Sequence, residues 1–288
     1  MISASQFYGF GQDTIVSDKI ERAVAEIYAQ YGHVVKVNRK SLRKYGRNTA
    51  VGTGEFDITP FTVGAYTTET YLSTNAIDSL SSGNAGDTNV PVYIEGMTRS
   101  GDELTFVSQT ANTDASNGQT RVPLTIPLCD CTRGRALAQG DIWIYENAAL
   151  TAGKPTDVTK IHNQVVTGDH TSLKAGTSIA RNNYFILLSY WATIGKASGS
   201  AACDMRVKVA TLGDSIFGDS FFTGEVWSIS QGSPPLGPPV DYEIFKPNSR
   251  IVMTGSASAG TLDVQAGFIG LFADVIMKTE NGILVPFS

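Results

Sequence analysis

The sequence predicts a mainly β protein: a jelly-roll-like antiparallel β-sandwich, either one large sandwich or two smaller ones, with a short N-terminal helix and an extended arm. Short apolar runs recur at intervals of roughly 8 to 15 residues, which is typical of sandwiches and barrels. The turns between these runs are rich in Gly, Asn and Asp. With 288 residues, of which 42% are hydrophobic, the chain can bury a sizeable core. We find no internal repeat that would indicate a propeller.

One helix is expected, over residues 18 to 31. Asp18 and Glu21 form a variant of the capping box, and Gly32 is suited to end the helix. The helix should either cover one end of the sandwich or contact a neighbouring subunit. The apolar residues at helical spacing form its predicted packing face: Ile20, Val24, Ile27, Tyr28 and Tyr31.

A basic arm is predicted directly after the helix. Residues 34 to 48 contain six basic residues and no acidic one, whereas the whole chain has a net charge of −5. The valines at 34, 35 and 37 disfavour a helix here, so the arm should be extended. An acidic protein surface is favoured as the partner of the arm over DNA, because the rest of the chain is acidic and would be repelled by DNA. Contact with DNA and simple exposure to solvent stay as alternatives. The predicted docking residues are Lys36, Arg39, Lys40, Arg43, Lys44 and Arg47.

Residues 1 to 48 are therefore assigned to the helix and docking arm, and residues 49 to 288 to the β-sandwich body, with a possible subdivision near 150 to 180. The last predicted strand should break at Gly267 or Gly270, and the proline-rich residues 233 to 239 should form an exposed connection. The predicted strands of the body are 61–72, 90–97, 103–109, 141–146, 161–167, 183–191, 204–211, 221–229, 240–245, 250–255 and 262–277.

The alternation of residue types adds detail to two of these strands. In one, Ile142 and Ile144 face one side while Trp143 and Tyr145 face the other, so both faces of the strand should be covered. In residues 204 to 209, apolar residues alternate with polar ones, as expected of a strand with one buried face and one face toward solvent.

No catalytic or metal-binding constellation is found in the sequence. The G-x-S-x-G, H-E-x-x-H and Walker patterns are absent, and the acidic residues show no marked pair. His33, His162 and His170 are scattered along the sequence. The three cysteines are expected to be reduced, because Cys129 and Cys131 are predicted to lie on one face of a strand, where they are poorly placed to bridge each other. We therefore predict a protein that is not an enzyme and has no cofactor, no metal and no membrane span.

Four short motifs resemble tailed-bacteriophage virion proteins of the capsid decoration (cement) type and related head or tail structural proteins. They are RKSLRKYGRN at 39–48, VYIEG at 92–96, YEIFKPNSRI at 242–251 and GFIGLF at 267–272. The resemblance spans about residues 39 to 287. It implies a structural protein of the capsid exterior, made in the host cytoplasm, often a homotrimer, whose partners are the major capsid protein or other virion proteins.

Three other functions stay open from the sequence. A tail or fibre protein could bind host-surface glycan by stacking Trp143, Trp191 or Trp227 on sugar rings, although these residues lie in patterns typical of a core. A polysaccharide hydrolase would need a carboxylate pair. A head-tail connector component usually contains more helix than this chain predicts.

Overall fold

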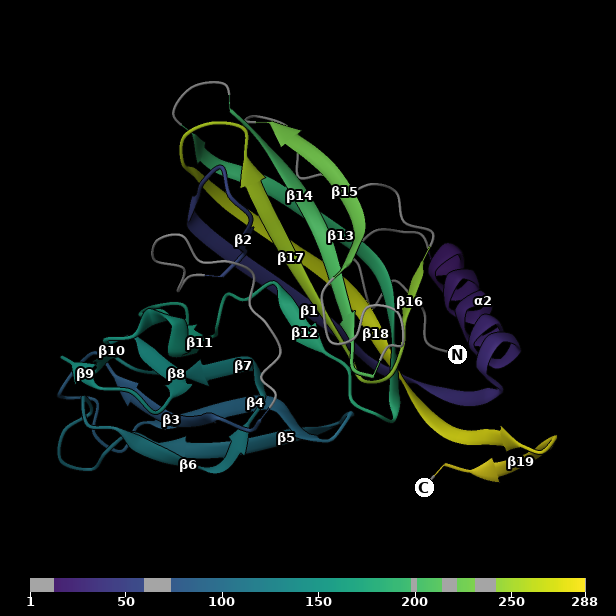
Figure 1. The fold of residues 1–288 in the computed structure, drawn as a ribbon, viewed down its shortest axis with the longest axis horizontal. Helices are drawn as coiled ribbons and strands as arrows, with labels where there is room; N and C mark the ends of the chain where they lie inside the picture. The colour runs from purple at the N-terminus through teal and green to yellow at the C-terminus, as the bar shows by residue number, and fades with distance from the viewer. Residues whose placement is uncertain (1–12, 60–73, 198–200, 214–221, 231–241, 288) are drawn as a thin grey trace.

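The computed structural model describes residues 13–59, 74–197, 201–213, 222–230 and 242–287, and within these it confirms a mainly antiparallel β protein with one N-terminal α-helix. The described chain forms two lobes (Figure 1). The first contains the early and late parts of the chain, and the second is formed by residues 74 to 173. The predicted strand at 61–72 and the proline-rich stretch lie outside the described residues.

The first lobe is a sandwich of two sheets. One has the strand order β1-β18-β13-β16, with β19 also paired to β18, and the other has the order β12-β17-β14-β15, with β2 also paired to β17. Going along the chain, most connections in this lobe cross from one sheet to the other, as in a jelly roll. The exceptions are β2 and β12, β14 and β15, and β18 and β19, which follow each other within one sheet. The strands are β1 (His33–Val51), β2 (Phe56–Asp57), β12 (Gly176–Ser178), β13 (Asn183–Ala197), β14 (Ala202–Thr211), β15 (Phe222–Ser230), β16 (Glu243–Phe245), β17 (Ser249–Ala257), β18 (Leu262–Glu280) and β19 (Ile283–Pro286).

The second lobe is a smaller sandwich with sheets of order β11-β8-β3-β6 and β5-β4-β7, together with the short β10-β9 pair. Its core is a separate cluster of buried apolar residues. Its elements are β3 (Ile77–Ser82), β4 (Pro91–Ser100), β5 (Glu103–Asn112), β6 (Val122–Leu128), β7 (Asp130–Ala136), β8 (Ile142–Glu146), β9 (Leu150–Thr151), β10 (Lys154–Pro155), the 3-10 helix η1 (Val158–Lys160) and β11 (Ile161–Val165).

The second lobe is inserted into a single strand position of the jelly roll. β2 and β12 both pair with β17, one on each side of Met253. At that point the Ile58 amide donates to the Met253 carbonyl (3.1 Å), and the Met253 amide donates to the Ala175 carbonyl (2.9 Å). The chain therefore leaves the first lobe after Ile58 and returns beside it at Ala175. The return lies within the interval 150 to 180 that the sequence suggested, whereas the departure had no sequence signal.

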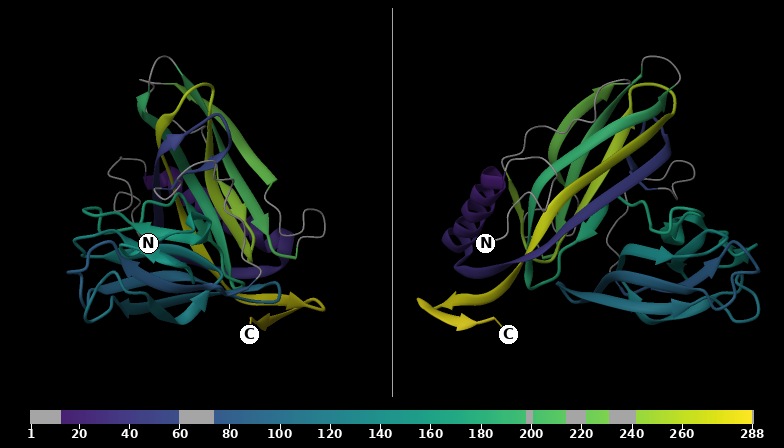
Figure 2. Two further views of the ribbon diagram at one scale, coloured as in Figure 1. Left: turned by 60° about the vertical axis from the view of Figure 1, so that its left-hand side comes forward. Right: turned by 180° about the vertical axis from the view of Figure 1, so that it is seen from behind.

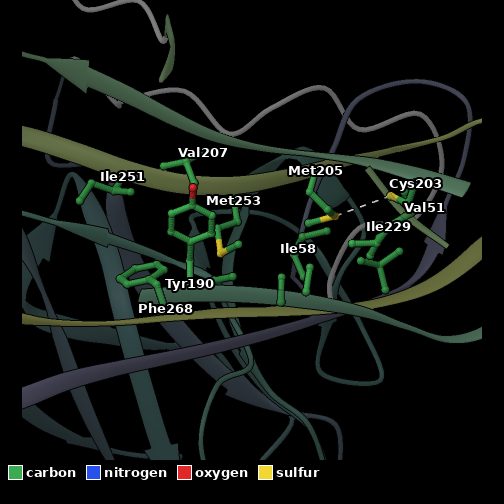
Figure 3. Close-up of a cluster of buried hydrophobic side chains, with 14 of the residues drawn as sticks. Val51, Ile58, Tyr190, Cys203, Met205, Val207, Ile229, Ile251, Met253 and Phe268 are labelled. Atoms are coloured by element: carbon green, nitrogen blue, oxygen red, sulfur yellow. Dashed lines mark hydrogen bonds between the residues drawn. The ribbon is translucent and has the colours of Figure 1, made fainter. Parts of the chain in front are cut away.

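Strand alternation fills the cores as the sequence predicts. Met205, Val207 and Val209 of β14 are buried in the first-lobe core, part of which is shown in Figure 3. On the opposite face Asp204 is exposed, but Lys208 is largely covered and paired with Glu55 (3.1 Å), so that face is less open to solvent than predicted. In β8 the side chains of Ile142 and Ile144 enter the second-lobe core. Trp143 and Tyr145 are buried in another cluster on the opposite face. Both faces of β8 are therefore covered.

Helix α2 (Asp13–Tyr31) begins earlier than the sequence predicts and ends where expected. Gly32 has φ +65°, and its amide donates to the Tyr28 carbonyl (2.9 Å), as in a glycine C-cap. The helix covers the outer face of the β1-β18-β13-β16 sheet (Figure 2). Over its described length it is not long and apolar enough to cross a bilayer.

The packing face of α2 differs from the predicted one at two positions: it includes Ala23 and leaves out Tyr28. Ile27 is fully buried, and Ile20, Val24 and Tyr31 are partly buried against the sheet. Tyr28 is 52% exposed, so its inclusion in the packing face was wrong. The face is centred on Ala23 and Ile27, which are one turn apart, and Tyr28 lies at its margin.

The segment predicted as a free docking arm is part of the sandwich. β1 pairs with β18 from His33 opposite Lys278 to Val51 opposite Leu262, so residue 48 lies within a strand and is no domain boundary. β18 itself does not break. A Cβ at Gly267 would lie 3.1 Å from the Trp191 ring, and one at Gly270 would collide with the Phe185 ring. Gly267 also makes room for the Lys44 carbonyl of β1, with which such a Cβ would collide, and Gly270 for the Phe185 ring of β13, so the two glycines allow close packing rather than ending the strand.

Candidate functional site

The seam between the lobes contains a buried ionic cluster around Asp130, the first residue of β7. The Asp130 carboxylate is held by Lys174 (Nζ to Oδ1, 3.2 Å), Arg250 (Nη2 to Oδ1, 3.1 Å) and Ser178 (Oγ to Oδ2, 2.6 Å). The side chains of Asp130, Lys174 and Arg250 are at most 2% exposed. Since Ser178 and Arg250 belong to the jelly roll, a carboxylate of the second lobe is bound by groups of the first.

Lys44 of β1 makes a second connection across the seam. Its side chain is buried, and its ammonium donates to the Thr132 carbonyl of β7. The pKa of Lys44 is lowered to about 7, mainly by burial and also by the charges of Arg133 and Lys174, which outweigh the opposing effect of Glu95 and Asp130. Cationic charge is therefore in excess around this lysine.

A third set of contacts closes the seam beside β5. Met97, Leu104 and Cys129 of the second lobe pack with Ala180, Ala210 and Leu212 of the first. The Leu104 amide donates to Asn248 Oδ1 (2.9 Å), and the Arg181 amide donates to the Leu104 carbonyl (2.8 Å). Ionic, polar and apolar contacts thus join the two lobes at separate points, which favours a rigid body.

Two neighbouring hollows open at the rim of the seam and share Arg133 and Arg135 of β7. The larger, of about 430 Å³, is also lined by Tyr93, Glu95 and His170, and the smaller, of about 310 Å³, by residues 43 to 45 of β1. Arg133 lies 3.4 Å from Glu95 (Nη1 to Oε2), and its side chain is 19% exposed. Burial lowers the pKa of Arg133 in spite of that carboxylate. The hollows are therefore cationic and accessible.

The predicted docking residues do not act as one group. Lys36 and Arg43 are exposed, whereas Lys44 is buried in the seam, where it cannot meet a partner. Arg47 forms an ion pair within its own sheet, with Nη2 2.7 Å from Asp263 Oδ2. The side chains of Arg39 and Lys40 lie outside the described residues.

The sequence reasoning missed Arg133 and Arg135. They alternate with Thr132 and Gly134, and this period of two could have indicated the strand β7. All three cysteines are free and buried, and burial raises the pKa of Cys129 and Cys131 to about 12, so these thiols stay protonated. His162 of β11 lies 2.8 Å from Glu146 of β8 (Nε2 to Oε1), and neither residue lines the two hollows.

No protein-family model and no curated protein matches the chain. Among solved structures, a chain titled "Structure of infectious bursal disease virus Gt strain" shares 9% sequence identity with a TM-score of 0.19, covering 88% of this chain and 76% of that chain. A likeness at this level carries no argument about fold or function.

Proposed function

We propose that this chain is a non-enzymatic structural protein of a bacteriophage particle, a decoration protein that binds the outside of the capsid shell. The proposal is supported by the phage-like motifs and by the jelly-roll fold of the first lobe. The observation that carries it is β1, an edge strand of its sheet that presents exposed cations, Lys36 and Arg43, from a body whose lobes are fastened together.

Such a body suits docking for an energetic reason. Each exposed ion pair contributes only about 0 to 1 kcal/mol, so a few cations cannot hold the protein on a shell by themselves. A rigid body loses little conformational freedom on binding, and repeated copies in a homotrimer would multiply the contacts. The partner would be an acidic surface of the major capsid protein or of another virion protein.

The docking is best tested by point substitutions. Deleting residues 1 to 48 would remove α2 and most of β1, and would expose the apolar face that the helix covers. The double substitution Lys36→Glu/Arg43→Glu leaves the strand backbone intact. Added to purified particles that lack the protein, this variant should show at least tenfold weaker binding, measured as occupancy against concentration.

The matched control is Arg22→Glu/Lys246→Glu, which changes the net charge equally at two other exposed cations of the first lobe. It should bind as the wild type does. Equal occupancy of the Lys36/Arg43 variant and the wild type, with unchanged thermal unfolding, would show that β1 is not the docking element. No binding of the wild-type protein to any such particle would refute the virion function itself.

A further inference from the structure

The larger hollow is built on one face of the β5-β4-β7 sheet. In this sheet Glu95 of β4 stands opposite Ser108 of β5 on one side and Arg133 of β7 on the other. Two residues earlier on β4, Tyr93 stands opposite Arg135. Residues two apart on a strand share a face, so a hydroxyl, a carboxylate, an aromatic ring and two guanidinium groups lie side by side.

A loop from outside this sheet forms one wall of the hollow. The Ala136 amide donates to the His170 carbonyl (3.2 Å), and Arg135 pairs with Thr171 through an isolated bridge. The exposed His170 lines the same hollow. The site is thus concave, and its volume of about 430 Å³ lies in the usual range for small-ligand sites, roughly 300 to 1,000 Å³.

The charges of the hollow favour an anion. Glu95 is the carboxylate between Arg133 (3.4 Å) and Arg135 (4.0 Å, Nη2 to Oε1). The side chain of Arg135 is 53% exposed, so its guanidinium can turn toward a ligand at little cost. Lys44 lines the neighbouring smaller hollow together with both arginines. A planar carboxylate would match the fork of Arg135.

The remaining groups indicate what else the ligand must present. Glu95 can only accept hydrogen bonds when ionised, and Ser108 can donate or accept. A ligand with hydroxyl groups would supply donors to Glu95, whereas a carboxylate-rich peptide would be repelled by it. Tyr93, 58% exposed, offers an aromatic face on which a sugar ring can lie.

We propose that this hollow binds an acidic saccharide unit of the uronic acid type. Its carboxylate contacts Arg135, its hydroxyl groups contact Glu95 and Ser108, and its ring lies against Tyr93. This binding site goes beyond the proposed capsid docking, which uses β1, and does not depend on it.

The test is to titrate the full chain with a disaccharide that ends in glucuronic acid and to measure binding by NMR and by calorimetry. The comparison ligand is the same disaccharide with the carboxyl group reduced to the alcohol. The acidic disaccharide should bind, and Arg135→Ala should weaken binding at least tenfold, while Arg135→Lys should weaken it less because the charge is kept. Tyr93→Ala should also weaken binding, by several-fold.

Matched controls are Arg181→Ala and Tyr28→Ala, which remove an exposed arginine and an exposed tyrosine elsewhere and should leave binding unchanged. Equal binding of the neutral disaccharide, or no binding of the acidic one up to about 10 mM, would overturn the proposal. An oligoglutamate peptide that binds more tightly, with the same dependence on Arg135, would assign the hollow to an acidic polypeptide and would also overturn it.

Discussion

The core of the jelly roll and the seam between the lobes are both buried, but the core consists of apolar side chains and the seam is centred on charged ones. Figure 3 shows the core filled by aliphatic, aromatic and sulfur-containing side chains from both sheets. The seam is centred on Asp130, Lys174 and Arg250, which are as buried as the core residues. Apolar packing is non-directional and roughly proportional to buried area, whereas buried charges require particular partners.

The apolar cores and the ionic seam therefore have different roles: the cores drive the folding of each lobe, and the seam fixes the position of one lobe on the other. Each lobe has its own apolar cluster and can collapse around it. The position of the second lobe on the first is specified by the seam, because Asp130 is satisfied only where Lys174, Ser178 and Arg250 converge. A core therefore tolerates substitutions that preserve volume. The seam tolerates few substitutions, because each charged group depends on particular partners.

The largest effect should come from removing the anion of the seam. Asp130→Ala leaves Lys174 and Arg250 buried without their carboxylate, and we expect the free energy of unfolding to fall by about 3 to 5 kcal/mol. Chemical denaturation measures this change. As a control, Asp263→Ala removes a carboxylate paired with the exposed Arg47 and should cost less than about 1 kcal/mol. A loss at Asp130 as small as at Asp263 would mean that the seam is hydrated rather than closed.

A crowding substitution tests the core. Gly270→Ala places a methyl group against the Phe185 ring and 2.5 Å from the Ile186 carbonyl oxygen, so strands β13 and β18 must move apart. We expect a loss of about 1 to 3 kcal/mol, seen as a lower thermal midpoint. Gly83→Ala is the control, since its Cβ would meet the nearest atom at an ordinary 3.5 Å. Equal midpoints for the two variants would contradict the tight packing at Gly270.

The pH dependence of stability tests the burial of Lys44. Its pKa is about 7 in the folded protein and 10.5 in the unfolded chain, so between these values the unfolded chain binds more protons. Stability should then rise with pH from 7 toward 10.5, by at most about 1.4 kcal/mol per pH unit from this group. Denaturation of wild type and Lys44→Met at pH 7 to 9 should show an advantage of methionine that shrinks as the pH rises. A constant difference would mean that Lys44 is exposed to solvent.

The smallest effect is expected at the surface of the same strand. Arg47→Ala removes the exposed ion pair with Asp263 and should lower the free energy of unfolding by about 0 to 1 kcal/mol. The loss should shrink further in high salt, because exposed charges are screened. A cost comparable with that of Asp130→Ala would remove the distinction between surface and seam pairs.

Local sequence patterns anticipated much of the fold. The helical spacing of apolar residues and Gly32 predicted the helix and its end, although the capping box at Asp18 did not mark its start, because α2 begins at Asp13. The alternation in residues 141 to 146 predicted a strand covered on both faces. The insertion was not predictable in the same way. β2 and β12 have two and three residues, too short for a periodic signal, and they share one strand position only because both pair with β17.

The candidate site was the least predictable part. Arg133 and Arg135 come from a strand of which the sequence indicated only the start, at residues 129 to 131. Glu95 and Tyr93 come from a predicted strand, and His170 comes from a loop. No spacing along the chain brings these residues together. Their shared face follows from the pairing of β4 with β5 and β7.

By itself, the sequence determined the fold class, the capped helix and the concentration of basic residues at 34 to 48, because alternation, capping and charge are local properties. Only the tertiary structure decided what those basic residues do. Lys44 is buried because Thr132 and Arg133 of an inserted lobe lie against it, and Arg47 is paired because β18 brings Asp263 beside it. Burial and pairing depend on segments that are distant in sequence, so the same run of cations divides into a buried lysine, a paired arginine and exposed charges.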